Sequence, residues 1–202
     1  MARPVSVAGA TVLRNAVAVL EAGGVVALPT DTVYGLAADP AVPGATDALF
    51  ALKGRPDTIE LPVLVADLAQ AEVFAEMTAP ARRLAEAFWP GALTLVVARR
   101  PGVDWSLGGL GHTVGVRSPA HPIPRSLCTM VGPLATTSAN RHGDPPLVDA
   151  SAVRRAFADV LGMVVDGGRC DGAPSTVVDV ASARCLRHGA LTWEEIEAVL
   201  AG

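Results

Sequence analysis

The chain has 202 residues, half of them apolar, and carries a formal net charge of −4 at pH 7. This charge is a poor match to general nucleic-acid binding, no apolar run reaches membrane-spanning length, and the N-terminus lacks the apolar stretch of a signal peptide. Three cysteines without a C-x-x-C pair argue against a disulfide framework or a zinc site, so we expect a single cytoplasmic domain over residues 1–202 whose cysteines are small buried hydrophobes.

The first quarter of the chain reads as a helix, a strand, a loop and a second helix. Apolar residues recur at helical spacing from Val12 to Leu20, and a glycine pair ends that helix. A buried strand is expected over 25–28 and a polar loop over 30–39. A helix over 45–52 is expected to place Lys53, the only lysine, just beyond its end.

The remaining elements alternate in the same manner. We expect strands at 62–65, 93–98, 113–117, 134–136, 163–166, 176–180 and 185–187, and helices at 67–77, 81–88, 123–131 and 151–160. Residues 100–112 are rich in Gly and Pro and are expected to form a mobile loop. Thr192 and Glu195 form a capping box that opens a final helix. Helices interleaved with short strands predict an α/β or α+β fold with a mixed sheet.

Two polar segments follow expected strands. The loop over 29–36 holds two threonine hydroxyls, a carboxylate and the only tyrosine. The run over 136–140 offers small donors and acceptors that can hold a phosphate or a purine edge. Taken singly, an ordinary polar or capped turn explains either segment.

Two cationic positions also allow two interpretations. Arg117 ends a strand on the same face as Thr113 and Gly115, which suits bidentate carboxylate binding, although an edge-strand cation is equally consistent. Lys53 and Arg55 flank a glycine and resemble a phosphate clamp at a helix end. On spacing alone, a solvated surface lysine explains Lys53 better.

Other catalytic and metal-binding patterns are not found. The histidines at 112, 121, 142 and 188 are scattered without metal spacing and are expected at surfaces or turns. No P-loop and no G-x-G-x-x-G occurs, and no Ser-His-Asp arrangement can be defended. We therefore expect no protein-built metal site.

Taken together, the polar segments resemble the YrdC-like family of threonylcarbamoyl-AMP synthases, in its short, single-domain form. The matching segments come in the family's order and cover nearly the whole chain: 29–36, 53–56, 88–94, 113–117, 137–140, 175–179 and 186–189. The resemblance implies a twisted α/β fold, with a mixed sheet flanked by helices and a large, positively charged concave cavity. It also implies a nucleotidyltransferase that forms threonylcarbamoyl-AMP and pyrophosphate from L-threonine, bicarbonate or CO2, and ATP.

The resemblance also implies site residues. The catalytic positions are Lys53 and Arg55. The family's ATP-binding positions fall on Lys53, Arg55, Thr113, Ser138, Asn140, Pro146 and Arg187, and its threonine-binding positions fall on Thr32, Arg117, Thr136 and Ser175. The chain departs from the family pattern between Ile59 and Ala66, where a strand ending in His is usual and where this segment is two residues longer.

The implied cofactor is Mg²⁺ that accompanies ATP, with no tightly bound group. The implied partners are ATP, L-threonine, bicarbonate and a downstream tRNA threonylcarbamoyl transferase complex, with a weak tRNA contact and no membrane. The main alternative is a non-catalytic nucleotide- or RNA-binding module of the same fold, although few aromatic residues are present for base stacking. A carbamoyl-phosphate-handling subdomain and plain ATP hydrolysis are further alternatives.

Overall fold

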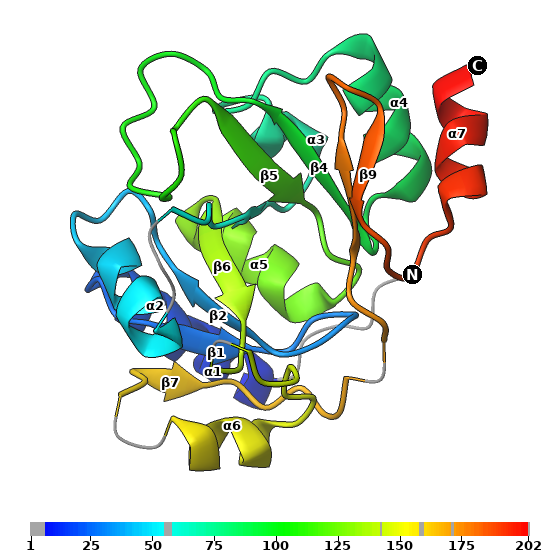
Figure 1. Cartoon of the computed structure of the whole chain (residues 1–202). Helices are drawn as coiled ribbons and strands as arrows, with labels where there is room; N and C mark the ends of the chain where they lie inside the picture. The colour runs from blue at the N-terminus through cyan, green and yellow to red at the C-terminus, as the bar shows by residue number, and fades with distance from the viewer. Residues whose placement is uncertain (1–6, 55–57, 142, 158–159, 171, 202) are drawn as a thin grey trace.

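The computed structural model describes residues 7–54, 58–141, 143–157, 160–170 and 172–201 (Figure 1). In this part of the chain, nine strands form one mixed sheet in the order β7-β1-β2-β6-β3-β5-β4-β8-β9. The strands are β1 Val26–Leu28, β2 Gly35–Ala38, β3 Val63–Leu64, β4 Leu93–Ala98, β5 Thr113–Arg117, β6 Leu134–Ser138, β7 Met163–Val164, β8 Thr176–Asp179 and β9 Arg184–Arg187. The predicted α/β class with a mixed sheet is confirmed.

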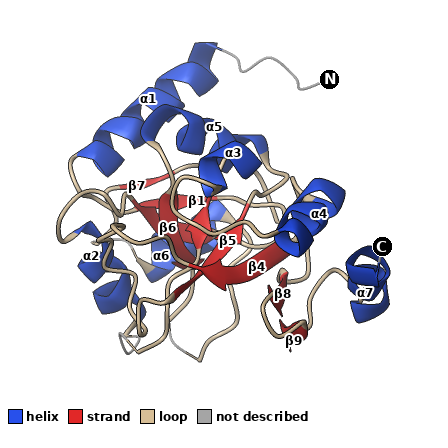
Figure 2. Ribbon diagram, turned by 90° about the horizontal axis from the view of Figure 1, so that it is seen from above, coloured by secondary structure: helices blue, strands red, loops and turns tan. Residues whose placement is uncertain are grey.

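Seven helices accompany the sheet within the same residues. They are α1 Val7–Glu21, α2 Ala45–Lys53, α3 Leu68–Ala71, α4 Ala79–Phe88, α5 Pro122–Val131, α6 Ala150–Ala156 and α7 Trp193–Ala201. Helices α1, α3 and α5 gather on one side of the strands, whereas α7 lies beside α4 (Figure 2). None of these helices is long and apolar enough to span a bilayer.

Alternating side chains divide the sheet between two apolar clusters. Val26 and Leu28 pack with the buried residues of α1 and α5, while Ala27 between them belongs to a larger cluster on the other face. This is the two-residue period of a strand, in which successive side chains point to opposite faces. Leu64 belongs to the α1 and α5 cluster and lies opposite Arg117 in the sheet. The face that α1 and α5 cover is therefore the face that carries Arg117.

One strand lies where the sequence predicts only loop. Residues 35–38 form β2, which pairs with β1 and β6. Their sequence, Gly-Leu-Ala-Ala, has little intrinsic preference for a strand. All four residues are buried, so pairing with the neighbouring strands decides their conformation.

Two predicted helices are shorter than expected. The helix expected over 67–77 is only α3, because the chain leaves the helix and Ala75 instead forms an isolated bridge with Arg99. Helix α6 ends at Ala156, before the expected residue 160, and residues 158 and 159 lie outside the described part. In the 67–77 segment, the contact with Arg99 overrides the helical pattern.

The segment over 100–112 is a loop that is anchored to the rest of the fold at Trp105 and Leu107. Leu107 is fully buried, and its carbonyl accepts from the backbone N–H of Leu61 at 2.7 Å. The centroid of the Trp105 ring lies 4.9 Å from the centroid of the Phe74 ring. Exposed residues gather near the tip, where Leu110 is 90% exposed. The sequence signal of Gly and Pro correctly marks a loop but does not reveal the buried anchors.

The cysteines only partly follow the prediction. Cys128 and Cys170 are buried, whereas Cys185 on β9 is half-buried. Its sulfur lies 3.7 Å from Nδ1 of His188. Cys185 is therefore not the buried hydrophobe that its composition class suggests.

Candidate active site

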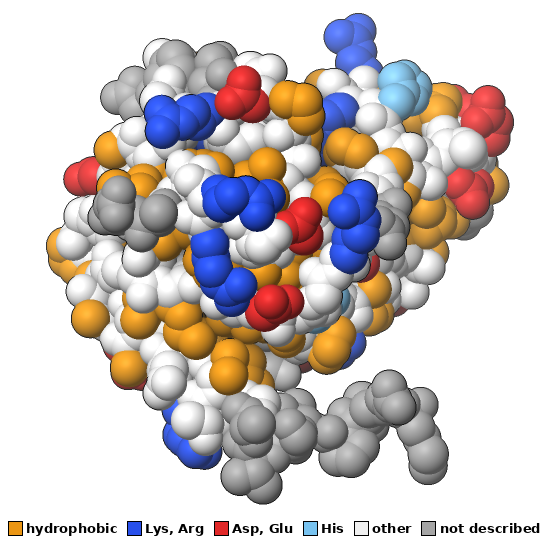
Figure 3. All heavy atoms as spheres, turned by 90° about the horizontal axis from the view of Figure 1, so that it is seen from below, with side chains coloured by type: hydrophobic (Ala, Val, Ile, Leu, Met, Phe, Trp, Pro, Cys, Tyr) orange, Lys and Arg blue, Asp and Glu red, His pale blue; other side chains and the backbone are white. Residues whose placement is uncertain are grey.

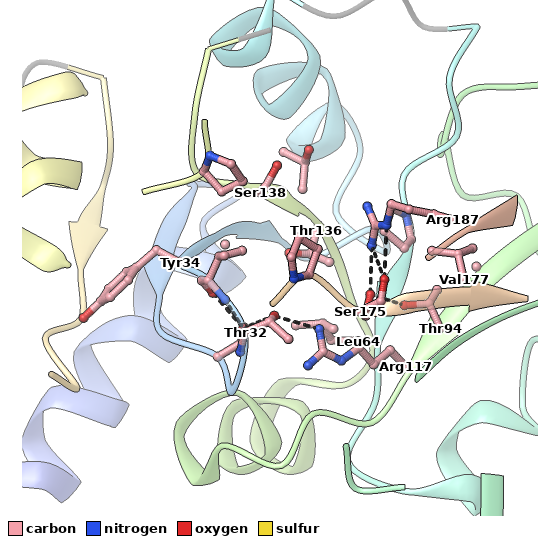
Figure 4. A pocket seen from close by; sticks show the side chains of 18 of the residues that line it. Thr32, Tyr34, Leu64, Thr94, Arg117, Thr136, Ser138, Ser175, Val177 and Arg187 are labelled. Atoms are coloured by element: carbon pink, nitrogen blue, oxygen red, sulfur yellow. Dashed lines mark hydrogen bonds between the residues drawn. The ribbon is translucent and has the colours of Figure 1, made fainter. Parts of the chain in front are cut away.

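The described residues form a cavity of about 370 Å³ on the face of the sheet that carries Arg117 (Figure 4). Its walls come from the loop between β1 and β2, from the seven strands that run from β2 to β9 in sheet order, and from Pro146 and Pro174. Thr94 and Val96 line the cavity, while Leu95 and Val97 between and beside them belong to the large core. Gly115 lies in the cavity wall, where the space for a side chain is limited: a Cβ atom there would lie 3.3 Å from Cβ of Pro62.

Strand register separates two ends of this cavity. Arg117 lies opposite Leu64, and Leu64 lies opposite Leu134 at the start of β6. Ser138 is four residues further along β6, which corresponds to about 13 Å of strand. Thr32 hydrogen-bonds to Arg117 although Gly35, three residues later, lies opposite Ser138. The loop between β1 and β2 therefore bends back along the cavity.

Lys53 stands behind one end of the cavity, where it meets Ser138 and Asn140. It is the last residue of α2, which ends because Gly54 adopts φ +58°. Its Nζ donates to the carbonyl and Oγ of Ser138, both at 2.8 Å, and to Oδ1 of Asn140 at 2.5 Å. Ser138 lines the cavity, and the buried ammonium lies directly behind it.

Arg117 defines the other end of the cavity and is 6% exposed. Its Nε donates to the carbonyl of Gly91 at 2.9 Å, and its Nη1 donates to Oγ1 of Thr32 at 3.0 Å. Its Nη2 lies 2.7 Å from Oδ1 of Asp31, in an ion pair. Burial lowers the pKa of Arg117, and the charge of Asp31 opposes that shift.

A second cation reaches the cavity from β9. Arg187 donates from Nε and Nη2 to the carbonyl of Ser175 and from Nη2 to its Oγ, at 2.9 to 3.1 Å. The Oγ of Ser175 also lies 2.9 Å from Oγ1 of Thr94 (Figure 4). Burial lowers the pKa of Arg187. Ser175 is therefore held on both sides at the cavity wall.

The other predicted positions differ in how they relate to the cavity. Thr136 and Pro146 line it, and the Oγ1 of Thr136 donates to the carbonyl of Leu36. Thr113 is exposed and does not line the cavity, but its Oγ1 donates to Oε2 of Glu60, which does. Arg55 lies outside the described residues.

Sequence reasoning gave no role to several residues of this site. Asp31 and Thr94 lie inside segments that carried the resemblance, so only their individual contacts were missed. Glu60 is the one carboxylate among the described residues of the cavity wall. Burial raises the pKa of Glu60, while the Thr113 hydrogen bond and the charge of Arg99 act in the opposite direction. Tyr34 also lines the cavity, and its hydroxyl donates to the carbonyl of Gly168 at 2.8 Å.

Metal ligands are scarce in the described part of the chain. It contains no group of three or more His, Cys, Asp or Glu side chains that could hold a metal ion. His121 is half-buried at the start of α5, where its Nδ1 accepts from the backbone N–H of Ile123 at 3.2 Å. Nothing in these residues provides a cage for a resident cation.

Comparison with known proteins gives a consistent set of relatives. The family model Sua5_yciO_yrdC, described as "Telomere recombination", matches residues 18–189. A Mycobacterium tuberculosis protein with a provisional name as a threonylcarbamoyl-AMP synthase is 42% identical over 190 residues, which are 92% of this chain and 88% of that protein. The threonylcarbamoyl-AMP synthase of Nitrosococcus oceani is 36% identical over 179 residues, covering 87% and 96% of the two chains.

A solved archaeal structure shares the fold. The crystal structure of Pyrococcus abyssi Sua5 complexed with L-threonine superposes with a TM-score of 0.87 at 40% identity. The match covers 93% of this chain and 56% of the archaeal chain, so the present chain spans little more than half of that protein. From the extent of the family match and from these identities, the chain belongs to the Sua5/YciO/YrdC family.

Proposed function

We propose that this chain is an L-threonylcarbamoyladenylate synthase, which forms threonylcarbamoyl-AMP and pyrophosphate from L-threonine, CO2 or bicarbonate, and ATP. The observation that carries the proposal is one cavity with a buried guanidinium at one end and the Lys53–Ser138–Asn140 cluster at the other. Arginine suits a carboxylate, and a compact ammonium among hydroxyl and amide groups suits phosphates. Relatives that bear this enzyme's name are 36% identical or more over most of the chain, which supports the same reading.

At the Arg117 end, we assign the amino acid. Arg117 binds its carboxylate, and the hydroxyls of Thr32, Thr136 and Ser175 bind its amine or side-chain hydroxyl. Thr32 and Ser175 are each fixed by an arginine, so their positions are set before the substrate arrives. Such preorganisation lowers the entropy cost of bringing the reactants together.

At the Ser138 end, we assign the nucleotide. Ser138 touches the phosphates, and Lys53 behind it supplies positive charge at short range. Asn140, Pro146 and Arg55 complete this end in the proposal. We also assign Thr113 and Arg187 to the nucleotide, and Arg187 reaches it from β9, where it holds Ser175 beside the amino acid. Arg117 and Arg187 line the cavity, whereas Glu60 is its one carboxylate among the described residues, so we expect a positive potential there although the chain as a whole is acidic. Mg²⁺ enters as part of the MgATP substrate and is held mainly by the triphosphate.

The reaction needs no protein nucleophile. The threonine amine attacks the carbon of CO2, an N–C bond forms, and the amine proton leaves to solvent. An oxygen of the resulting N-carboxylate then attacks the α-phosphorus of ATP, and the bond to the pyrophosphate oxygen breaks. The chain's residues position the two reactants and offset the negative charge that gathers as they meet.

The product is a reactive mixed anhydride, so a second protein has to consume it. We propose that a separate transferase complex passes the threonylcarbamoyl group to tRNA, with at most a weak tRNA contact to this chain. On the face shown in Figure 3, basic and acidic side chains are interspersed. Arg154 and Asp166, both exposed, form an ion pair with 3.7 Å between Nη1 and Oδ2. Mixed signs of charge do not favour the RNA-binding alternative on this face.

The test is incubation with ATP, Mg²⁺, bicarbonate and labelled threonine. We expect pyrophosphate release that depends on threonine, together with a labelled threonylcarbamoyl-AMP peak in mass spectrometry. Omitting threonine measures plain ATP hydrolysis, and retention of RNA without threonine at physiological salt measures the binding-module alternative. Pyrophosphate or phosphate release that is indifferent to threonine would overturn the proposal.

A further inference from the structure

The guanidinium of Arg117 is held from three directions by residues far apart in the sequence. Its acceptors are the carbonyl of Gly91, Oγ1 of Thr32 and Oδ1 of Asp31, and each takes one hydrogen bond. Gly91 precedes β4, whereas Asp31 and Thr32 lie in the loop between β1 and β2. The orientation of Arg117 therefore depends on how that loop meets the sheet.

Counting hydrogens shows what this arrangement leaves for a ligand. A guanidinium carries five N–H donors, one on Nε and two on each terminal nitrogen. Within the described residues, the three bonds use one donor on Nε, one on Nη1 and one on Nη2. One donor remains on each terminal nitrogen, which is the number that a bidentate carboxylate contact requires.

Asp31 differs from the other two acceptors in charge and in place. Its side chain does not line the cavity, whereas Arg117 and Thr32 do. Its carboxylate is the one ion-pair partner of Arg117 among the described residues, and it is itself only 19% exposed. A charged hydrogen bond in such a setting is stronger and more directional than the bonds to a carbonyl or a hydroxyl.

We infer that Asp31 is a positioning residue for amino acid binding: it holds the Arg117 guanidinium in the plane that presents its two remaining donors to the substrate carboxylate. This inference rests on the proposed function, because it takes the ligand of Arg117 to be the amino acid carboxylate. Asp31 acts through Arg117 and does not touch the substrate.

If only the charge of Asp31 mattered, its removal would tighten threonine binding, whereas the positioning role predicts weaker binding. Asp31 partly neutralises Arg117, so its removal would strengthen the attraction of the cavity for any anion. Arg187 is also near enough to depress the pKa of Arg117, so the cavity already holds a second cation that attracts anions. If charge dominated, Asp31→Asn would tighten threonine binding. If orientation dominates, the same change weakens it.

The experiment compares wild type with Asp31→Asn and Asp31→Glu, using threonine-dependent pyrophosphate release and threonine titration calorimetry. We expect Asp31→Asn to raise the threonine KM and Kd roughly 10-fold, because a neutral amide oxygen replaces a charged acceptor of the Arg117 hydrogen bond, with the ATP KM unchanged. Asp31→Glu should recover part of that loss. A threonine Kd for Asp31→Asn equal to or tighter than that of wild type overturns the inference.

A double-mutant cycle separates positioning from a general structural role. In an Arg117→Met background, adding Asp31→Asn should change threonine binding little, because the group through which Asp31 acts is absent. An equal loss in both backgrounds would overturn the inference. Asp166→Asn, which breaks the exposed pair with Arg154, is the matched control and should leave threonine binding unchanged.

Melting curves of all variants exclude simple unfolding as the cause of a loss. The proposed function fails separately from this inference: wild type would then show no threonine-dependent pyrophosphate release. If wild type releases pyrophosphate with threonine and Asp31→Asn keeps the wild-type Kd, the function stands and the role of Asp31 does not.

Discussion

Lys53 shows how much a single side chain depends on its surroundings. Three acceptors on Ser138 and Asn140 converge on one nitrogen at 2.5 to 2.8 Å. An ammonium has three donors that radiate from one atom, so it can satisfy all three acceptors. The planar fork of arginine spreads its donors over three nitrogens and cannot do so.

We therefore expect Lys53→Arg to be nearly as inactive as Lys53→Met. Losing a preorganised charged donor costs roughly 2–4 kcal/mol of transition-state stabilisation, which corresponds to about 30- to 10³-fold in kcat. The measurement is the rate of threonine-dependent pyrophosphate release, with a melting curve for each variant. Full activity of a folded Lys53→Arg would show that only the charge matters, and full activity of Lys53→Met would remove Lys53 from the mechanism.

At the scale of elements, the start of helix α7 is specified by residues next to it in the sequence. The backbone N–H and Oγ1 of Thr192 donate to Oε2 of Glu195, and the N–H of Glu195 donates back to Oγ1 of Thr192. This reciprocal pair is the predicted capping box, and it is confirmed. The helix then packs beside α4, where Arg83 donates to the carbonyls of Val199 and Leu200.

Thr192→Ala is expected to destabilise the fold by about 1 kcal/mol, because it removes the cap from α7. For a chain of this size, that corresponds to a fall in Tm of about 2–4 °C, measurable by circular dichroism. Thr129→Ala on α5 is the control: Thr129 is exposed and bonds to the carbonyl of Arg125 within its own helix. Equal Tm values for the two variants would show that the cap does not stabilise α7.

At the scale of the whole molecule, packing gives three chemically identical thiols different exposure to solvent. Burial raises the pKa of Cys128 to about 12, and Cys170 is 5% exposed. Cys185 lies half-buried on β9, the last strand at one side of the sheet. A thiol reacts as its thiolate and only where a reagent can reach it.

We expect one fast-reacting thiol in the native chain at pH 8 and three after unfolding in guanidinium chloride. Ellman's reagent measures both numbers. Cys185→Ser should remove the fast phase and leave the two slow thiols. A fast phase that survives in Cys185→Ser would mean that Cys128 or Cys170 becomes accessible in the native state, contrary to their burial.

Most elements were predicted correctly because apolar periodicity and turn residues within a few positions of one another specify a strand or a helix. Strands β4 and β5 lie at the predicted residues, since alternating or continuous apolar runs between turns specify a strand directly. Strand β2 was missed because Gly-Leu-Ala-Ala has no strand preference of its own. Helix α3 was overextended because an apolar pattern does not reveal where tertiary contacts stop a helix.

The amino-acid order by itself determined the α/β class, most element positions and the ordered set of polar segments that resembles the family. Only the tertiary structure decided that Lys53 meets Ser138 and Asn140, and that Arg117 is held by Asp31, across separations of 85 to 87 residues. Periodicity and capping report interactions within a few residues of one another. A guanidinium and a carboxylate 86 residues apart meet only after the sheet has brought their strands and loops together, so no local pattern records their contact.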